Sequence, residues 1–209
     1  MGVTMREVGA PDYHEPRDAL ARNWAAFFHA AIPEVAWLPV PNLGADRAEE
    51  FFERWALDAL TLTGGEDVGT SPMRDETEYA LFQYCLRRDL PVLGVCRGMQ
   101  FIWQAIGGQL ETRTGHRAVR HFVTGCGERE SSGRVTFREV NSFHSHCVLI
   151  PPEPLAEAPV AFACAEDGTA EGIRFRDGRV VGVMWHPERE ARPHLSDVAL
   201  IRRLVGLEN

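Results

Sequence analysis

The chain has 209 residues, a hydrophobic share of 44% and a formal net charge of −8. This length suits one domain, and the hydrophobic share is ordinary for a globular protein. The acidic balance, without any basic stripe, argues against a nucleic-acid partner. No apolar run approaches the roughly 20 residues of a membrane helix, and residues 1–10 contain no signal-peptide core. We therefore expect a single cytoplasmic domain over residues 1–209, with no membrane partner.

The cysteines predict neither a disulfide framework nor a zinc site. Their number is odd, their positions are scattered, and no two of them form a C-x-x-C pair. The five are Cys85, Cys96, Cys126, Cys147 and Cys164. We expect Cys85 and Cys164 to pack in the core, because Cys85 lies on a helix face and Cys164 lies in an alanine-rich strand.

In the first half of the chain, short apolar runs alternate with helical patterns. Strands are expected at residues 2–8, 35–40, 59–63 and 91–95, and helices at residues 17–31, 45–57, 75–88 and 98–106. This alternation is typical of a doubly wound α/β fold, a mostly parallel sheet with helices on both faces.

The second half is richer in strands. They are expected at residues 134–140, 147–150, 160–165, 173–176 and 180–184. The sequence Arg-Asp-Gly-Arg at residues 176–179 predicts a tight hairpin turn. We expect a proline-rich surface loop at residues 151–159 and a last helix at residues 197–207.

A candidate nucleophile, Cys96, stands between an expected strand and an expected helix. Gly94 and Gly98 flank it in a G-x-C-x-G pattern. A nucleophile on a sharp strand-to-helix turn needs small residues two positions before and after it. The helix that follows directs its N-terminal N–H groups at the sulfur and favours the thiolate. The alternative is a buried, inert cysteine beside two glycines that turn the chain.

A candidate base, His186, ends the apolar strand expected at residues 180–184. Pro187 stops that strand, and Glu188 follows within hydrogen-bonding reach of the imidazole. A cysteine nucleophile needs a base that takes its proton and later returns it to the leaving amine. The alternative for His186 and Glu188 is a solvated strand end.

Residues 112–121 concentrate basic side chains, with histidines at His116 and His121. We expect a solvated loop here, because no third metal ligand is evident in the sequence. No metal site and no cofactor are therefore expected. The same residues could instead meet an anionic part of a substrate.

These motifs together resemble a known enzyme group. The sequence Gly-Val-Cys-Arg-Gly-Met-Gln at residues 94–100 and Trp-His-Pro-Glu at residues 185–188 look like the two signatures of class I glutamine amidotransferases. Arg97, after the cysteine, is similar to the peptidase C26 branch, the γ-glutamyl hydrolases, as are residues 140–144 and the pair Arg74-Asp75. The resemblance implies a flavodoxin-like, class I glutamine amidotransferase fold with a β-rich second half.

The resemblance also assigns roles to residues. Cys96 would attack the γ-carbonyl of a γ-glutamyl amide, His186 would be general base and then general acid, and Glu188 would orient His186. The backbone N–H groups of Gly65 and Arg97 match an oxyanion hole. The expected contacts with the glutamyl group are Gln100, His144, Ser145 and His146. Ser145 departs from the pattern, because branch members often have glycine there.

A narrower resemblance concerns residues 13–20 and Trp24, which are similar to γ-glutamyl-CDP-amidate hydrolases. An anionic diphosphate in the leaving group would give the basic segment a role through charge-assisted hydrogen bonds. The candidate leaving-group contacts are Arg113, His116, Arg117, Arg120 and His121. The alternative is that these side chains are solvent-exposed charges without a role in substrate binding.

Three functions remain open from the sequence. The first is a stand-alone γ-glutamyl hydrolase acting on a small-molecule amide. The second is a glutaminase subunit that passes ammonia to a partner synthase. The third is a redox protein with Cys96 as an oxidisable thiol, which leaves residues 185–188 unexplained. The oligomeric state is open as well, a homo-oligomer included.

Overall fold

The computed structural model describes residues 1–126, 137–150 and 159–207. Its helices are α1 (Asn23–Ala31), α2 (Ala45–Arg54), α3 (Pro72–Arg88), α4 (Arg97–Ala105) and α5 (Leu195–Leu204), with a short 3-10 helix η1 (Pro187–Arg189). Its strands are β1 (Gly2–Thr4), β2 (Arg6–Val8), β3 (Arg17–Ala19), β4 (Leu38–Val40), β5 (Leu60–Leu62), β6 (Val92–Val95), β7 (Leu110–Thr112), β8 (Arg117–Gly125), β9 (Phe137–Phe143), β10 (His146–Val148), β11 (Val160–Ala165), β12 (Ala170–Phe175) and β13 (Val180–Val183).

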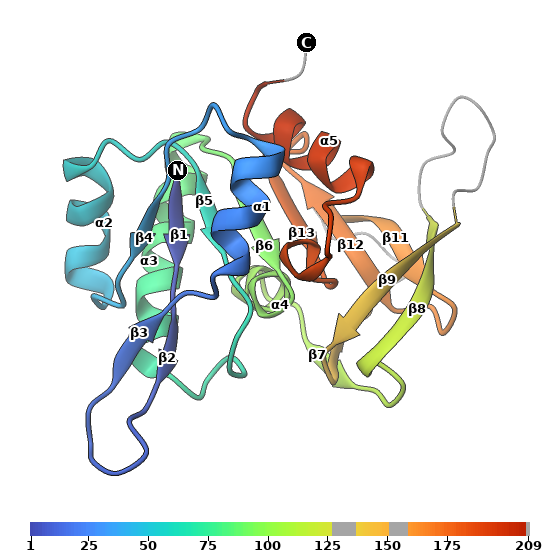
Figure 1. Cartoon of the computed structure of the whole chain (residues 1–209), viewed down its shortest axis with the longest axis horizontal. Coiled ribbons are helices and arrows are strands. Elements are labelled where there is room, and N and C mark those ends of the chain that lie inside the picture. The colour runs from blue at the N-terminus through green and yellow to red at the C-terminus, as the bar shows by residue number, and fades with distance from the viewer. Residues whose placement is uncertain (127–136, 151–158, 208–209) are drawn as a thin grey trace.

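The main sheet has a parallel half and an antiparallel half (Figure 1). Its strands follow the order β4-β1-β5-β6-β13-β12-β11-β8-β9. Neighbours from β4 to β13 run parallel, and neighbours from β13 to β9 run antiparallel. β10 pairs with β12 and β7, whereas β2 and β3 form a separate hairpin. The expected α/β fold with a mostly parallel core and a strand-rich second half is confirmed.

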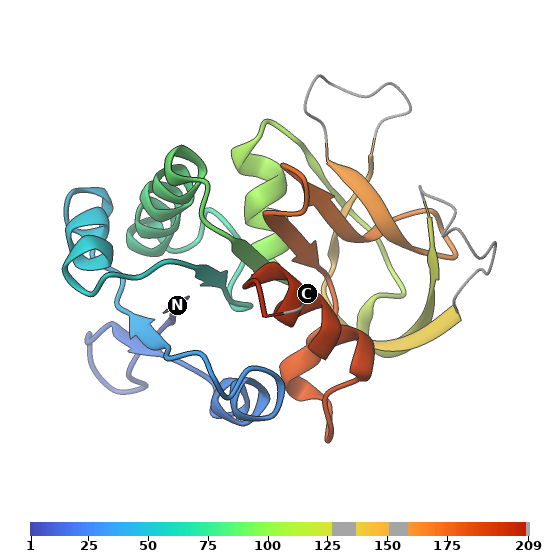
Figure 2. The ribbon, with the colours of Figure 1, turned by 90° about the horizontal axis from the view of Figure 1, so that it is seen from above.

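Helices cover both faces of the parallel half, as the view from above shows (Figure 2). α2, α3 and α4 pack on one face and α1 and α5 on the other. Successive side chains of a strand point to opposite faces, and β6 follows this rule. Val92 joins the core cluster under α4, while Leu93 and Val95 join the cluster under α1 and α5. β6 is therefore buried on both faces, as expected of a central parallel strand.

The first expected strand and helix are only partly correct. Residues 2–8 divide into β1 in the main sheet and β2 in the hairpin, and residues 17–19 are β3 rather than the first turn of a helix. Arg17 pairs with Val8 and Ala19 with Arg6 across the hairpin. The helical periodicity from residue 20 onward is real, and α1 buries Trp24, as expected. In residues 17–19, strand pairing with β2 overrides the helical periodicity.

The expectation of a chain without disulfides is wrong. Cys126 and Cys164 form a disulfide with a Cα–Cα distance of 6.0 Å. The two cysteines are 38 residues apart and meet because β8 lies antiparallel to β11, where Thr124 pairs with Cys164. Only that pairing brings them together, so the spacing of the cysteines along the chain gave no signal. Disulfides are typical of oxidising compartments.

The expected solvated loop at residues 112–121 is only partly correct. Residues 113–116 form a loop and most side chains of the segment are exposed, but residues 117–121 lie in β8, which pairs with β9 and β11. The turn expected at residues 176–179 is present between β12 and β13, with positive φ at Arg176, Asp177 and Gly178. The proline-rich segment 151–159 lies, except for its last residue, outside the described residues.

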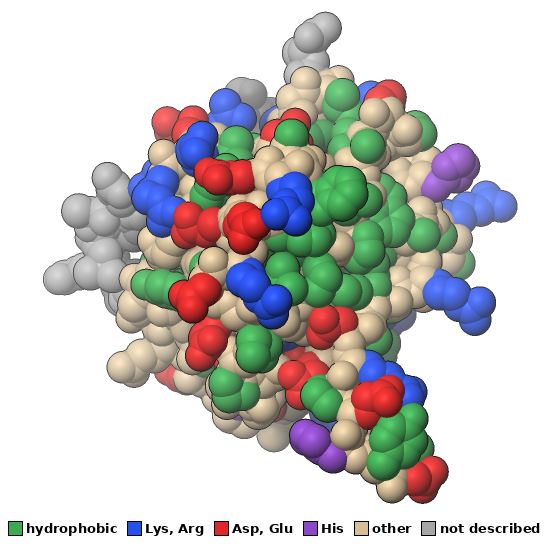
Figure 3. All heavy atoms as spheres, turned by 90° about the vertical axis from the view of Figure 1, so that its left-hand side faces the viewer, with side chains coloured by type: hydrophobic (Ala, Val, Ile, Leu, Met, Phe, Trp, Pro, Cys, Tyr) green, Lys and Arg blue, Asp and Glu red, His purple; other side chains and the backbone are tan. Residues whose placement is uncertain are grey.

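The face that carries α2 and the β2–β3 hairpin mixes acidic and basic side chains (Figure 3). Surface ion pairs here join Arg87 to Glu49 at 2.8 Å and Arg88 to Glu53 at 3.0 Å, which link α3 to α2. Charge of one sign is not gathered on this face. None of the described helices combines the length and apolar character that crossing a membrane requires.

Candidate active site

Three neighbouring parallel strands bring the candidate residues to one edge of the sheet. β6 lies between β5 and β13, and Gly94 of β6 is level with Leu62 on one side and Gly182 on the other. The loop 63–65 follows β5, Cys96 follows β6, and His186 follows β13. Ligands of open α/β sheets bind at this carboxyl edge. Residues far apart in the sequence thus meet because their strands are neighbours.

Cys96 occupies a strained turn between β6 and α4. Its φ of 52° and ψ of −105° lie outside the regions that L-residues favour. The turn is tightly packed, because a Cβ on Gly98 would lie 2.2 Å from the carbonyl oxygen of Leu62. The N–H of Cys96 donates to the carbonyl of Val183 over 2.7 Å, which ties the turn to β13. The thiol therefore sits at the N-terminus of α4.

His186 lies between the thiol and a carboxylate. Its Nδ1 is 2.7 Å from Oε1 of Glu188, and both side chains are buried. Burial by itself lowers the pKa of His186, but hydrogen bonds and charge interactions with Cys96 and Glu188 outweigh it and raise the pKa to about 9. The ring is thus held where it can carry a proton next to sulfur.

Cys85 shows the contrast with a structural cysteine. It is fully buried in α3, and burial raises the pKa of its thiol to about 12. Such a thiol is inert at neutral pH.

The backbone of His186 is fixed from β9. Asn141 accepts from the His186 N–H and donates to its carbonyl, both over 2.9 Å. The Phe143 ring lies 5.8 Å from the imidazole, nearly perpendicular to it. Sequence reasoning missed the contact of Asn141, because two segments 45 residues apart make it.

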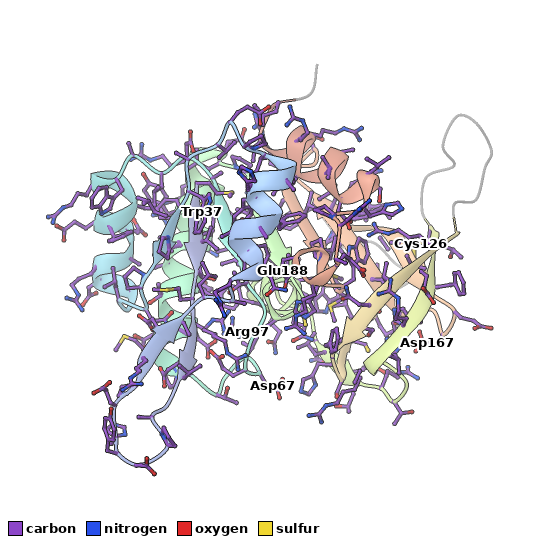
Figure 4. All side chains as sticks on the ribbon, in the orientation of Figure 1. Trp37, Asp67, Arg97, Cys126, Asp167 and Glu188 are labelled. Carbon is purple, nitrogen blue, oxygen red and sulfur yellow. A yellow bond between two sulfur atoms is a disulfide. The ribbon has the colours of Figure 1, made fainter. Side chains whose placement is uncertain are left out.

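A buried ionic network joins the 63–65 loop to the cysteine turn. Arg74 donates to the carbonyl of Thr63 over 2.7 Å and to Glu78 over 2.9 Å. Arg97, next to the nucleophile candidate, pairs with the other oxygen of Glu78 and with Asp75. Burial opposes the charge on Glu78, but the two arginines outweigh it and lower the pKa of that carboxyl. One carboxylate thus positions both the loop and the turn (Arg97 is labelled in Figure 4).

The stretch 144–146 lies against α4. Gln100 donates through Nε2 to the carbonyl of His146 over 2.9 Å. The carbonyl of Ser145 accepts from the N–H of Arg113 over 2.9 Å. Gln100 and residues 144–146, which the resemblance assigned to one glutamyl pocket, are therefore in mutual contact.

Comparison with known proteins establishes the family. A family model described as Peptidase C26 matches residues 2–188. The chain belongs to the peptidase C26 family. It is 29% identical over 196 residues to the γ-glutamyl-CDP-amidate hydrolase of Campylobacter jejuni, covering 91% of this chain and 90% of that protein. The family and this relative make the chain a hydrolase of amide bonds.

More distant relatives of this peptidase C26 member include synthase components. The carbamoyl phosphate synthase small chain of Mycobacterium leprae is 32% identical over 123 residues, covering 55% of this chain and 31% of that protein. A putative GMP synthase protein of Thermoplasma acidophilum superposes with a TM-score of 0.66 at 18% identity, covering 99% of this chain and 93% of that one. A glutamine amidotransferase of Thermotoga maritima superposes with a TM-score of 0.63 at 15% identity, covering 98% and 84%. The fold is thus that of class I glutamine amidotransferases.

The structure divides the basic segment of this peptidase C26 member into two groups. Arg113 and Arg120 are half-exposed and pair with nearby carboxylates, Arg113 with Glu111 and Arg120 with Glu139, while Arg117 is exposed. His116 and His121 turn inward instead. Both approach the buried carboxylate of Glu171, which sequence reasoning did not single out.

Glu78 was also missed. It lies four residues after Arg74, but the residues between them are Asp75, Glu76 and Thr77. A charged pair at that spacing in a polar stretch indicates a surface contact, so the sequence carried no signal that this pair is buried.

Proposed function

We propose that this chain hydrolyses a γ-glutamyl amide through a cysteinyl thioester, with Cys96, His186 and Glu188 as a catalytic triad. The observation that carries the proposal is the hydrogen bond between Glu188 and His186, together with the interaction of His186 with a cysteine on a strained strand-to-helix turn. The peptidase C26 family and the relative from Campylobacter support the same bond class.

The reaction proceeds in two halves. His186 takes the thiol proton of Cys96, and the resulting thiolate beside the charged imidazole attacks the γ-carbonyl carbon. The tetrahedral intermediate collapses, the C–N bond breaks, and the same proton passes from His186 to the leaving nitrogen. Water then gives a proton to His186 and attacks the thioester, which releases glutamate and restores the thiol. Glu188 keeps the imidazole in the tautomer that both halves need and stabilises its charged form.

The oxyanion is assigned to the backbone N–H groups of Gly65 and Arg97. Each such donor is worth about 3 kcal/mol of transition-state stabilisation. The network through Glu78 supports this assignment, because it restrains both donor segments by charged side chains. The glutamyl α-carboxylate is assigned to residues 144–146 and Gln100.

For the leaving group we propose a γ-glutamyl-CDP-amidate, which would yield cytidine diphosphoramidate. The support is the relative that covers 91% of this chain and the arginines Arg113, Arg117 and Arg120 of the basic segment, which would pair with a diphosphate. The proposed hydrolysis needs no cofactor, because the thiol, the imidazole, the carboxylate and two backbone N–H groups supply its chemistry.

A second function, a glutaminase subunit that delivers ammonia to a synthase, is favoured by the similarity to carbamoyl phosphate synthase small chains. That relative exceeds this chain in length, since the match covers 31% of it. In this case the isolated chain would be slow and a partner would activate it.

Glutamate release by the purified chain tests both functions. The substrates are a γ-glutamyl nucleotide amidate, γ-glutamyl-γ-aminobutyrate, a γ-glutamyl polyamine and L-glutamine, with Cys96→Ala as the control. Rapid, Cys96-dependent release from the nucleotide amidate is expected. Slow release from glutamine alone would favour the synthase subunit. Equal release by wild type and Cys96→Ala would contradict the thioester mechanism.

A further inference from the structure

Three histidines surround one buried carboxylate behind the 144–146 stretch. Glu171, in β12, is fully buried. His116 Nδ1 lies 3.4 Å and His144 Nε2 lies 3.3 Å from its Oε1, and His121 Nε2 lies 3.3 Å from its Oε2. The His116 ring stands 4.9 Å from that of His121 and 4.8 Å from that of His144. Segments next to β8, β9 and β12 supply the four side chains.

The atoms that face one another are buried but form no well-directed hydrogen bonds. This holds for both oxygens of Glu171, for His116 Nδ1, and for the Nε2 atoms of His121 and His144. An unsatisfied buried polar atom is destabilising, and more so when it is charged. One partner shared by these five atoms would remove that cost. A single cation at the point where their lone pairs converge would satisfy all of them.

The remaining nitrogens of two histidines are held as metal ligands usually are. His116 Nε2 lies 3.0 Å from Oδ2 of Asp167, and His144 Nδ1 lies 3.1 Å from the carbonyl oxygen of His146. A ligating imidazole commonly donates its second N–H to a carboxylate or a backbone carbonyl, which fixes the tautomer and the ring orientation. These bonds leave His116 Nδ1 and His144 Nε2 as acceptors, directed at Glu171. Asp167 is labelled on the strand-rich side of Figure 4.

The spacing fits a small cation with nitrogen and oxygen ligands. With metal–ligand bonds of about 2.0–2.1 Å, a tetrahedral site has edges of about 3.3 Å. Two measured distances converge on Oε1 of Glu171, 3.4 Å from His116 Nδ1 and 3.3 Å from His144 Nε2, and His121 Nε2 lies 3.3 Å from Oε2. His116, His121 and Glu171 also place their ligand atoms within 4.8 Å of one another.

From this geometry we propose that His116, His121, His144 and Glu171 bind one zinc-class divalent cation. Four protein ligands leave no open position, so the site is structural rather than catalytic. No third ligand was evident beside His116 and His121 in the sequence, because Glu171 is far from both along the chain. The cation would brace β8 and β12 beneath the 144–146 stretch.

The test is cobalt binding by the Cys96→Ala variant, since the Cys96 thiolate with His186 could itself capture a metal. The protein is treated with EDTA, desalted and titrated with Co²⁺. One equivalent with the visible absorption of tetrahedral cobalt is expected, and added Zn²⁺ should abolish that absorption. His121→Gln in the same background should weaken cobalt binding at least tenfold. His29→Gln, which changes an exposed histidine of α1, should bind as tightly as the parent.

A second measurement does not depend on the folding of the histidine variants. Zn²⁺ at a hundredfold excess over its Kd should raise the Tm of EDTA-treated Cys96→Ala protein, because only the folded state assembles the site. Absence of both the cobalt spectrum and the Tm shift would overturn the proposal and leave a network of charged histidines around Glu171. Unchanged cobalt binding by His121→Gln would also overturn it. Neither readout involves glutamate release, so both are independent of the proposed hydrolysis.

Discussion

Replacing Gly64 by alanine should disable the enzyme while leaving its fold intact. A Cβ at this position would lie 2.7 Å from Cε1 of His186. Carbon atoms normally approach to about 3.5–4.0 Å, so the ring must retreat by roughly 1 Å. The backbone of Gly64 is not among those with positive φ, so alanine itself fits there. The substitution therefore acts on the imidazole rather than on the chain.

The expected loss follows from that displacement. A shift of 1 Å in a catalytic group costs about 100-fold in rate, or about 2.7 kcal/mol of barrier. The ring would also pull away from Glu188, now 2.7 Å distant, and this would lower the pKa of His186. We expect kcat/KM for the best substrate of the panel to fall about 100-fold and its basic pH limb to shift to lower pH.

Steady-state glutamate release over a range of pH measures both effects. Gly9→Ala is the matched control, because a Cβ there meets nothing within 4 Å. Thermal unfolding of both variants should stay near that of the wild type. A wild-type kcat/KM for Gly64→Ala would refute the reasoning. A loss without a shift of the pH profile would assign the effect to the oxyanion loop and not to His186.

Three further predictions follow from other contacts. Glu188→Gln removes the charge that helps raise the pKa of His186. The kcat should therefore fall on the order of 10⁴-fold, and the basic limb of the pH–rate profile should move to lower pH. A basic limb at its wild-type pH would contradict the role assigned to Glu188. Arg97→Met removes the positive charge that pairs with the carboxylates of Asp75 and Glu78. It should lower the free energy of unfolding in urea by about 3–5 kcal/mol, whereas the exposed Arg87→Met should lower it by about 0–1 kcal/mol. Cys126→Ser removes the disulfide that closes a 38-residue loop and should lower the free energy of unfolding by about 4 kcal/mol in the same assay. Equal stability of the oxidised wild type and the variant would argue against the disulfide.

The central strands and the turn at Cys96 could be predicted because their signals are local. A buried parallel strand, two glycines at fixed offsets from a cysteine, and a following helix all lie within residues 91–106. The same holds for the strand end at His186 and the carboxylate two residues later. Local periodicity and turn chemistry decide such elements.

Features that depend on long-range pairing could not be predicted. The approach of three histidines to Glu171 and the disulfide arise where β8, β9, β11 and β12 pair with one another. The contact of Asn141 with His186 joins β9 to the segment after β13. Neither the identity nor the spacing of these residues in the sequence indicates which strands will be neighbours. The helical pattern near residue 20 predicted a helix that begins at residue 17. Pairing within the β2–β3 hairpin places residues 17–19 in a strand instead.

The β2–β3 hairpin is a part of this enzyme that can change without disturbing the main sheet. It stands outside the main sheet, yet its base lies against the loop assigned to the oxyanion, since a Cβ on Gly65 would be 3.1 Å from that of Arg6. Glu7 fastens that base, donating through its N–H to Glu66 over 3.3 Å and accepting from Ser71 over 3.0 Å. Residues 9–16 beyond the base can lengthen, shorten or change charge without altering the register of any strand that holds Cys96 or His186. The tip can therefore vary in length and sequence while the strands that carry Cys96 and His186 stay unchanged.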